Sequence, residues 1–357
     1  MALATATDRG NHFNLLRLVF ACLVIVAHCP ELVYGDRSHE PLTMLFGTVS
    51  FGDLAVDGFF FLSGYLIVKS WTRRPEWSVF LAARARRILP GFVVSSLLCA
   101  LVVGPLGGGA DYFERFSLVD FASSLVTLAQ PTIPPVFGGT HYPIVNGSIW
   151  TIVYEVRCYL AVLLFGLLGG FRIRFAWLAA TAVCMLLFML GRFDAWPLSG
   201  AAGQHMARFF MLFGVGGCFW LYGRPMLARR GLMLPAAVLL AILISLPRWA
   251  ELGLALFGAY LCLHVAVREA SSFAWFNTLP DVSYGVYLYA WPITKLLLWW
   301  WPTLSAPVVT FLTLAASLAA GALSWYLVER PFMRQRPDSR ERPGVPAFRI
   351  AQSNDVP

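Results

Sequence analysis

The sequence has 357 residues, of which 58% are hydrophobic and only 13% are charged, and its mean hydropathy is +0.67. This composition excludes an ordinary soluble protein and is typical of an integral membrane protein. The net charge of +8 would suggest nucleic-acid binding in a soluble chain, but in a membrane protein it indicates basic cytoplasmic loops.

The apolar residues fall into ten runs that are cut by Pro, Gly and charged residues. A membrane-spanning helix needs about 20 mostly apolar residues, so ten such helices would fill most of the chain. We therefore expect an all-α integral membrane protein with about ten transmembrane helices, although three short runs leave counts of eight to eleven open. The runs are Phe13 to Tyr34, Phe51 to Trp71, Ile88 to Val103, Ser148 to Gly169, Phe175 to Leu190, His205 to Tyr222, Leu232 to Leu246, Trp249 to Val267, Val282 to Trp301 and Pro307 to Val328.

Basic residues set the expected orientation. With the N-terminus inside, the inner segments carry 19 Lys and Arg residues and the outer loops carry four. This asymmetry predicts that both termini are cytoplasmic. We divide the chain into a cytoplasmic N-terminus (residues 1–12), a membrane domain (13–333) and a disordered basic cytoplasmic tail (334–357). The longest outer loop, residues 104–147, is long enough to act as a lid.

The seven cysteines lie within apolar segments and form no CxxC pair. We interpret them as reduced packing residues, neither a disulfide framework nor a metal site. The first apolar run is followed by no small-x-small cleavage site, so it is expected to remain as an uncleaved helix.

Four cations lie within the apolar runs, where a charge is costly unless it faces a polar cavity, a ligand or a partner. One of them, Arg17, lies eleven residues before His28 on the first run. At about 100° per residue the two share one helix face, separated by about 16 Å along the axis. A histidine alone would be interpreted as a core residue bonded to a carbonyl. The other three intramembrane cations are Arg157, Arg208 and Lys295.

Two carboxylates, Asp57 and Glu155, are expected at the same depth in the membrane as His28. Counted from the outer ends of their runs, His28, Asp57 and Glu155 each lie about 9–10 Å deep. Their shared depth predicts a buried polar site in which Asp57 or Glu155 orients the imidazole as a general base. The alternative for either carboxylate is a structural pairing with one of the intramembrane cations.

Arg84 and Arg87 belong to a basic cluster that precedes the third run. Guanidinium groups suit phosphate, so this cluster together with Arg17 could hold a nucleotide-like donor that enters from the cytosol. The alternative is a topology signal that binds anionic lipid. The sequence contains no P-loop, GxSxG, HExxH or dinucleotide-binding fingerprint, so these enzyme classes have no support.

Six ordered motifs resemble those of the membrane acyltransferase 3 family, a family of bacterial O-acyltransferases. The resemblance covers residues 11–333, nearly the whole membrane domain. Where many members of that family have His, this chain has Ala290. The motifs are Arg17 with His28, Asp57-Gly-Phe-Phe-Phe-Leu-Ser-Gly-Tyr65, Arg84-Ala-Arg-Arg-Ile-Leu-Pro90, Gly147-Ser-Ile-Trp-Thr151 with Tyr154-Glu155, Ser283-Tyr-Gly-Val-Tyr-Leu-Tyr-Ala-Trp-Pro292 and Glu329-Arg-Pro-Phe332.

The resemblance implies a multi-pass protein of the bacterial inner membrane with acetyl-coenzyme A as donor and a cell-envelope or exported glycan as acceptor. By position, Arg17 and His28 match the family's essential pair, and Arg84 and Arg87 match its inner basic motif. The expected partners are a glycan or lipid-linked glycan, membrane lipid and the machinery of exopolysaccharide or lipopolysaccharide assembly, with no nucleic acid and no metal.

These observations predict an O-acyltransferase in which Arg17, Arg84 and Arg87 hold the phosphates of coenzyme A. His28 would either deprotonate the acceptor hydroxyl or be acetylated itself. The competing hypothesis is a secondary transporter or exporter of a glycan or small solute that uses the buried charges as its pathway, although no internal repeat supports it.

Overall fold

The structure is a computed structural model, and it describes residues 11–193, 200–268, 276 and 279–334. Within these ranges the secondary structure is helical, with no strand. The outer parts of the predicted termini, residues 1–10 and 335–357, lie outside the described residues, so the predicted disordered tail is not addressed by the structure.

Each of the ten apolar runs coincides with a helix, and the first agrees with its helix, α1, at both ends. The helices are α1 (Phe13–Tyr34), α3 (Phe51–Arg73), α4 (Trp77–Leu98), α7 (Ile152–Leu167), α8 (Ala176–Arg192), α9 (Gly200–Leu221), α11 (Met233–Ile244), α12 (Ala250–Gly253) with α13 (Ala259–Val267), α14 (Ser283–Trp300) and α15 (Ala306–Ser324). Short elements join them: α2 (Pro41–Phe46), α5 (Gly104–Gly107), α6 (Leu118–Val126), α10 (Arg224–Leu227) and α16 (Arg330–Arg334).

By length and composition, six helical segments of the described chain could cross a membrane. They are Phe13–Tyr34, Phe51–Arg73, Trp77–Gly107, Ile149–Leu167, Ala250–Val267 and Ala306–Met333. This supports an all-α, multi-pass membrane protein, while the count of ten crossings and the cytoplasmic termini remain predictions.

The predicted start of the third span at Ile88 is wrong. The helix begins eleven residues earlier, at Trp77, so Arg84 and Arg87 lie within α4 and do not precede it. Hydropathy ends a span at charged residues, but these two arginines line a cavity inside the protein. A helix can continue through charged residues where its side chains face such a cavity.

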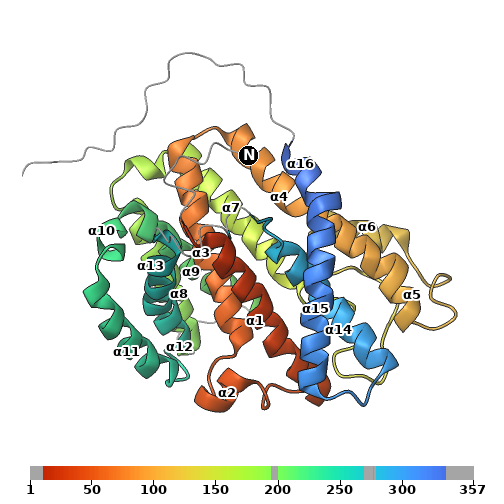
Figure 1. The fold of residues 1–357 in the computed structure, drawn as a ribbon. Helices are drawn as coiled ribbons and strands as arrows, with labels where there is room; N and C mark the ends of the chain where they lie inside the picture. The colour runs from red at the N-terminus through yellow and green to blue at the C-terminus, as the bar shows by residue number, and fades with distance from the viewer. Residues whose placement is uncertain (1–10, 194–199, 269–275, 277–278, 335–357) are drawn as a thin grey trace, which may run out of the picture.

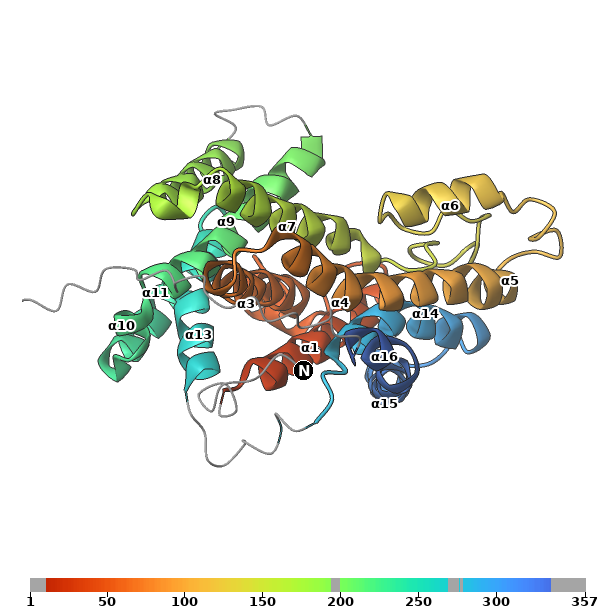
Figure 2. The same cartoon turned by 90° about the horizontal axis from the view of Figure 1, so that it is seen from above.

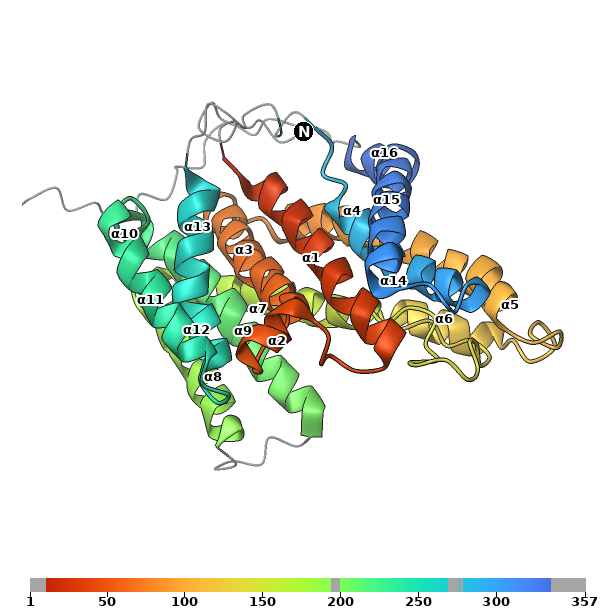
Figure 3. The ribbon, with the colours of Figure 1, turned by 60° about the horizontal axis from the view of Figure 1, so that its bottom comes forward.

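In Figures 1 to 3, α1 and α3 lie in the middle of the bundle. Helices α8 and α10 to α13 form one flank, and α5, α6, α14 and α15 form the other. Helix α3 packs most extensively on α9, and α1 packs on α3, α14 and α15. The first helix therefore contacts both halves of the bundle.

Two glycines allow α3 and α9 to touch. A Cβ atom at Gly64 would lie 2.0 Å from the Phe213 carbonyl oxygen, and one at Gly216 would lie 2.0 Å from the Phe61 carbonyl oxygen. Small residues at a helix crossing let backbones approach closely in a membrane. Gly64 and Gly216 therefore serve the close packing of these two helices.

Helix α15 presents an apolar surface outward. Phe311, Leu323 and the neighbouring Leu327 are 61–70% exposed. Exposed apolar side chains of this size along a membrane helix are covered by lipid hydrocarbon, which has no need of polar partners. The core residues, by contrast, are concentrated around α3, α7, α9 and α13.

Candidate functional site

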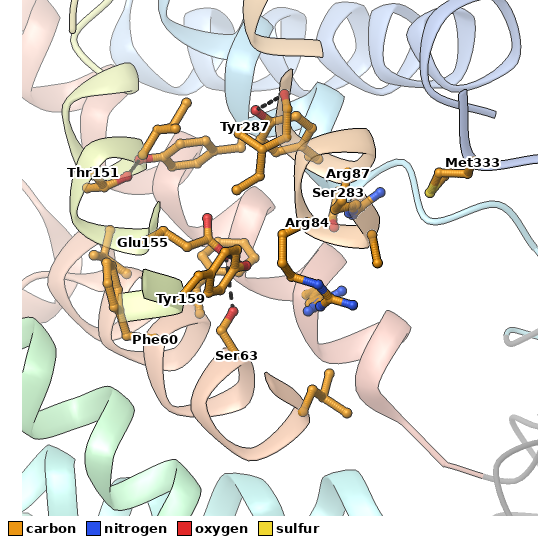
Figure 4. Close-up of a pocket in the computed structure, with 18 residues that line it drawn as sticks. Phe60, Ser63, Arg84, Arg87, Thr151, Glu155, Tyr159, Ser283, Tyr287 and Met333 are labelled. Atoms are coloured by element: carbon orange, nitrogen blue, oxygen red, sulfur yellow. Dashed lines mark hydrogen bonds between the residues drawn. The ribbon is translucent and has the colours of Figure 1, made fainter. Parts of the chain in front are cut away.

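A cavity of about 390 Å³ lies between α1, α3, α4, α7 and α14 (Figure 4). Four of the six residues predicted for the site line it: Arg17, Arg84, Arg87 and Glu155. His28 and Asp57 do not. The other polar lining residues are Ser63, Thr151, Tyr159, Ser283, Tyr284 and Tyr287.

Arg87 is held by two carboxylates. Its Nη2 lies 2.6 Å from Asp281 Oδ2, and its Nη1 lies 3.1 Å from Oε2 of Glu329. Glu329 is fully buried in a π-helical turn, η8 (Trp325–Glu329), that continues α15. Removing either partner would leave a charge without compensation, so Arg87 has a structural role in addition to its place in the cavity wall.

Arg17 shares the same carboxylate, with its Nη1 3.4 Å from Asp281 Oδ2. Asp281 lies just before α14 and also accepts hydrogen bonds from the Ser283 hydroxyl and amide. Burial alone would raise the pKa of Asp281, but Arg87, Arg17 and the Ser283 bonds outweigh burial and lower it. Asp281 therefore remains ionised at neutral pH.

Arg84 differs from both. Within the described chain it forms no ion pair, its buried Nε has no hydrogen-bond partner, and its guanidinium lies 5.9 Å from the centre of the Phe80 ring. Arg84 is thus a cation in the cavity wall with hydrogen-bond donors to spare. A cation in this setting is expected to bind an anion that enters the cavity.

Glu155 lies on the opposite wall. It accepts hydrogen bonds from the Tyr159 hydroxyl and from Ser63 Oγ, the latter at 3.3 Å (Figure 4). No contact with His28 is observed. The hypothesis that Glu155 orients the imidazole is therefore not supported by the geometry, although Glu155 does belong to the cavity.

His28 lies one compartment away from this cavity. It borders a small space of about 10 Å³ together with Ser148, Ala290 and Trp291, and the Trp291 indole meets the imidazole edge-on with centroids 5.2 Å apart. The carboxylate that contacts the imidazole is Glu31, whose Oε2 lies 2.9 Å from Nδ1. With Nδ1 bonded to a carboxylate, Nε2 is left as the basic nitrogen.

Glu31 is itself fixed from the loop that follows α1. Arg37 Nε lies 3.2 Å from Glu31 Oε1, and Arg37 Nη1 lies 3.3 Å from Asp53 Oδ2. Asp53 forms a capping box with Ser50 at the start of α3. A continuous set of charged contacts thus connects His28 with the beginning of the third helix.

Asp57 belongs to that set of charged contacts but does not contact the His28 imidazole. It is fully buried, and its Oδ1 accepts a hydrogen bond of 2.7 Å from Arg208 Nη2 on α9. The same nitrogen lies 3.7 Å from Asp53 Oδ1. The prediction that Asp57 contacts His28 is thus contradicted by the geometry, and the structural alternative, a pairing with Arg208, is confirmed.

The remaining two cations of the apolar runs, Lys295 and Arg157, have separate surroundings. Lys295 is buried, and its Nζ donates to Thr140 Oγ1 at 2.7 Å and to the His141 carbonyl at 2.8 Å. It thereby ties the loop of residues 104–147 to α14. Arg157 is exposed and stacks over Tyr154 at 5.5 Å.

Sequence reasoning missed Glu31 and Asp281. Glu31 follows His28 by three residues on one helix, and this spacing places two side chains on adjacent positions of the helix surface, so the signal was present. Asp281 lies outside the apolar runs and offered no signal. In the described part of the chain, no group of three or more His, Cys, Asp or Glu residues could hold a metal ion.

The family model described as an acyltransferase domain matches residues 11–328 of this chain. The chain belongs to the acyltransferase 3 family. The match covers nearly all of the described helices, so the resemblance drawn from the six motifs is confirmed, and the protein is an acyltransferase and a multi-pass membrane protein.

Two curated proteins are similar over almost their full lengths. A protein named O-acetyl transferase from Shigella phage Sf6 is 28% identical over 346 residues, which cover 91% of this chain and 96% of that protein. Nodulation protein 10 of Rhizobium leguminosarum bv. viciae is 27% identical over 373 residues, covering 93% and 95%. No solved structure matches the chain.

Proposed function

We propose that this acyltransferase moves an acetyl group from acetyl-coenzyme A to a hydroxyl group of a polysaccharide, lipopolysaccharide or lipid-linked glycan at the bacterial inner membrane. The observation that carries the proposal is Arg84, which has no ion pair among the described residues, whereas Arg17 and Arg87 in the same cavity are paired. The name of the phage relative, O-acetyl transferase, supports acetyl as the group that is moved.

The cavity has the composition that an acyl-coenzyme A molecule requires. Arg84 and, behind it, Arg17 and Arg87 would contact the phosphates at the end that the positive-inside asymmetry assigns to the cytoplasm. Between them and Tyr287 the wall is largely apolar, with Ser63, Glu155 and Tyr159 as hydrogen-bonding groups. A pantetheine arm, which alternates methylene and amide groups, fits such a lining.

His28 and Glu31 supply the chemistry. In direct transfer, the acceptor oxygen attacks the thioester carbonyl carbon while Nε2 of His28 takes the hydroxyl proton, and the bond from carbon to sulfur then breaks as the thiolate leaves and takes up that proton. In the alternative route, Nε2 attacks the carbonyl carbon first, and the bond from carbon to sulfur breaks as the thiolate leaves. The acceptor oxygen then attacks the acetyl-imidazole, the bond from carbon to Nε2 breaks, and the hydroxyl proton passes to the thiolate. Glu31 holds Nδ1 in both routes, so Nε2 is the nitrogen that reacts.

The acceptor would reach His28 from the outer side, because His28 lies in the outer third of α1 under the orientation given by the basic residues. An exported glycan is the acceptor that the family resemblance implies. Membrane lipid and the proteins that assemble exopolysaccharide or lipopolysaccharide are the proposed neighbours.

Purified protein supplied with acetyl-coenzyme A and an unacetylated bacterial polysaccharide tests the proposal. We expect release of the free thiol of coenzyme A to depend on the polysaccharide, together with acetyl ester on the glycan. Movement of a glycan across vesicles without loss of the thioester would instead support the transporter hypothesis.

A further inference from the structure

Tyr287 stands between the large cavity and the compartment of His28. Its ring lines the cavity, whereas Ala290 and Trp291, which lie one turn further along α14, border the space beside His28. Its hydroxyl donates a hydrogen bond of 2.6 Å to the carbonyl oxygen of Ser148, a residue that also borders the space beside His28. One side chain therefore lines the cavity and bonds a residue that borders the space beside His28.

The hydrogen bonds at this boundary allow only one arrangement of the hydroxyl protons of Thr151 and Tyr287. Thr151 Oγ1 and Tyr287 Oη lie 2.7 Å apart, and either could donate. A tyrosine hydroxyl has one proton, and the Ser148 carbonyl can only accept, so the proton of Tyr287 goes to Ser148 and Thr151 donates to Tyr287. The hydroxyl protons of Thr151 and Tyr287 are thus both engaged; these two side chains and the Ser148 carbonyl are called the hydroxyl layer below.

Packing closes the layer further. The Phe59 ring, which also lines the cavity, meets the Tyr287 ring edge-on with centroids 5.9 Å apart. Thr151 ends a short 3₁₀ turn, η3 (Ile149–Thr151), that leads into α7. Tight 3₁₀ turns within a helix often mark places where the backbone can adjust.

We propose that Tyr287 keeps the donor thioester apart from His28 and from water until its bond to Ser148 breaks. This inference rests on the proposed function, since it needs acetyl-coenzyme A in the cavity. Without such a barrier, water could take the place of the acceptor: its oxygen would attack the thioester carbon, His28 would take its proton, and the broken carbon–sulfur bond would give acetate and free coenzyme A. The layer would thus prevent wasteful hydrolysis.

Acceptor-free hydrolysis of acetyl-coenzyme A by the purified full-length protein is the test. Tyr287→Phe keeps the ring but removes the donor to Ser148, so hydrolysis should rise about two- to tenfold, the effect of losing one net hydrogen bond from the closed state. The matched control is Tyr289→Phe. Tyr289 is a buried tyrosine on the same helix whose hydroxyl bonds Ser324 and which lines neither compartment, so its rate should match wild type.

A second variant tests whether the additional hydrolysis depends on His28. Adding His28→Ala to Tyr287→Phe should abolish the increase, because the water would then have no base. If Tyr287→Phe does not fold, Thr151→Val, which removes the other bond of the layer, should give an increase of the same kind. Hydrolysis that stays at the wild-type rate, or that rises equally in Tyr289→Phe, would overturn the inference.

The two proposals fail differently. If wild-type protein transfers acetyl to the polysaccharide while the Tyr287 and Thr151 variants show no extra hydrolysis, only the role of Tyr287 is refuted. If wild-type protein neither binds nor cleaves acetyl-coenzyme A, the proposed function itself is refuted.

Discussion

His28 Nδ1 and Glu31 Oε2 lie 2.9 Å apart on successive turns of α1. The histidine and the carboxylate that orients it therefore come from one helix, and no second helix has to be placed for the pair to form. A second helix, α3, takes part only through Arg37, which contacts both Glu31 and Asp53 at the start of that helix.

The contact between His28 and Glu31 predicts how variants of the two residues change the rate of acyl transfer. His28→Ala should lower acyl transfer by about 10²–10⁴-fold, the usual loss for a general base, while donor binding is preserved because His28 does not line the cavity. Glu31→Gln should also lower transfer. Since two groups that act as one unit are not additive, the double variant should be no slower than His28→Ala alone. Rate constants and donor dissociation constants check this, and fully multiplicative losses would separate Glu31 from His28.

The two cavity arginines of α4 should behave differently. Arg84→Ala should weaken binding of acetyl-coenzyme A with little change in thermal unfolding, because Arg84 has no ion pair within the described part of the chain. Arg87→Ala should cost about 3–5 kcal/mol of stability, since it leaves buried Glu329 without its cation. Calorimetric titration and thermal melts of both variants distinguish the roles. Equal losses of stability in the two would mean that Arg84 is a structural residue.

Asp57 and Arg208 should prove structural. Asp57→Ala leaves Arg208 buried with only the longer contact to Asp53, so the variant should be strongly destabilised. Asp57→Leu combined with Arg208→Met replaces the pair with apolar side chains and should recover much of the stability. Yields of folded protein in detergent measure this. Transfer per folded molecule should stay within a few-fold of wild type in the double variant, and a His28-like loss would restore Asp57 as a catalytic candidate.

Orientation is tested by labelling. Cysteine introduced at Ser38 should react in intact cells with an impermeant thiol reagent, whereas cysteine at Ser78 should not. Gly138 is a second outer position and is preferable to Gly139, whose φ of +77° would strain a cysteine. Wild-type protein is the background, because its seven native cysteines are buried or partly buried. If the cysteine introduced at Ser78 reacted and the one at Ser38 did not, the expected orientation and the proposed direction of transfer would both be reversed.

The sequence predicted the helices better than it predicted their neighbours. Apolar runs and the helix rise gave α1 to the residue, and they placed His28, Asp57 and Glu155 at one depth. Depth, however, does not state which way a side chain faces. Asp57 faces Arg208 on α9, whereas Glu155 bonds Tyr159, one turn further along α7, and Ser63 on α3. The packing of α3 against α9 and of α7 against α3, which no single helix encodes, turns the two carboxylates away from His28.

Asp281 and Glu329 lie far along the chain from the arginines that they neutralise, and this has a consequence for biosynthesis. Arg87 is made as part of α4, roughly 190 residues before Asp281 and roughly 240 residues before Glu329. Until then the ribosome-bound chain carries Arg17 and Arg87 without these counter-ions. The end of the bundle that holds Arg17 and Arg87 can therefore pack stably only after η8 has been made. Chains truncated before η8 should fold poorly and be degraded by membrane quality-control proteases.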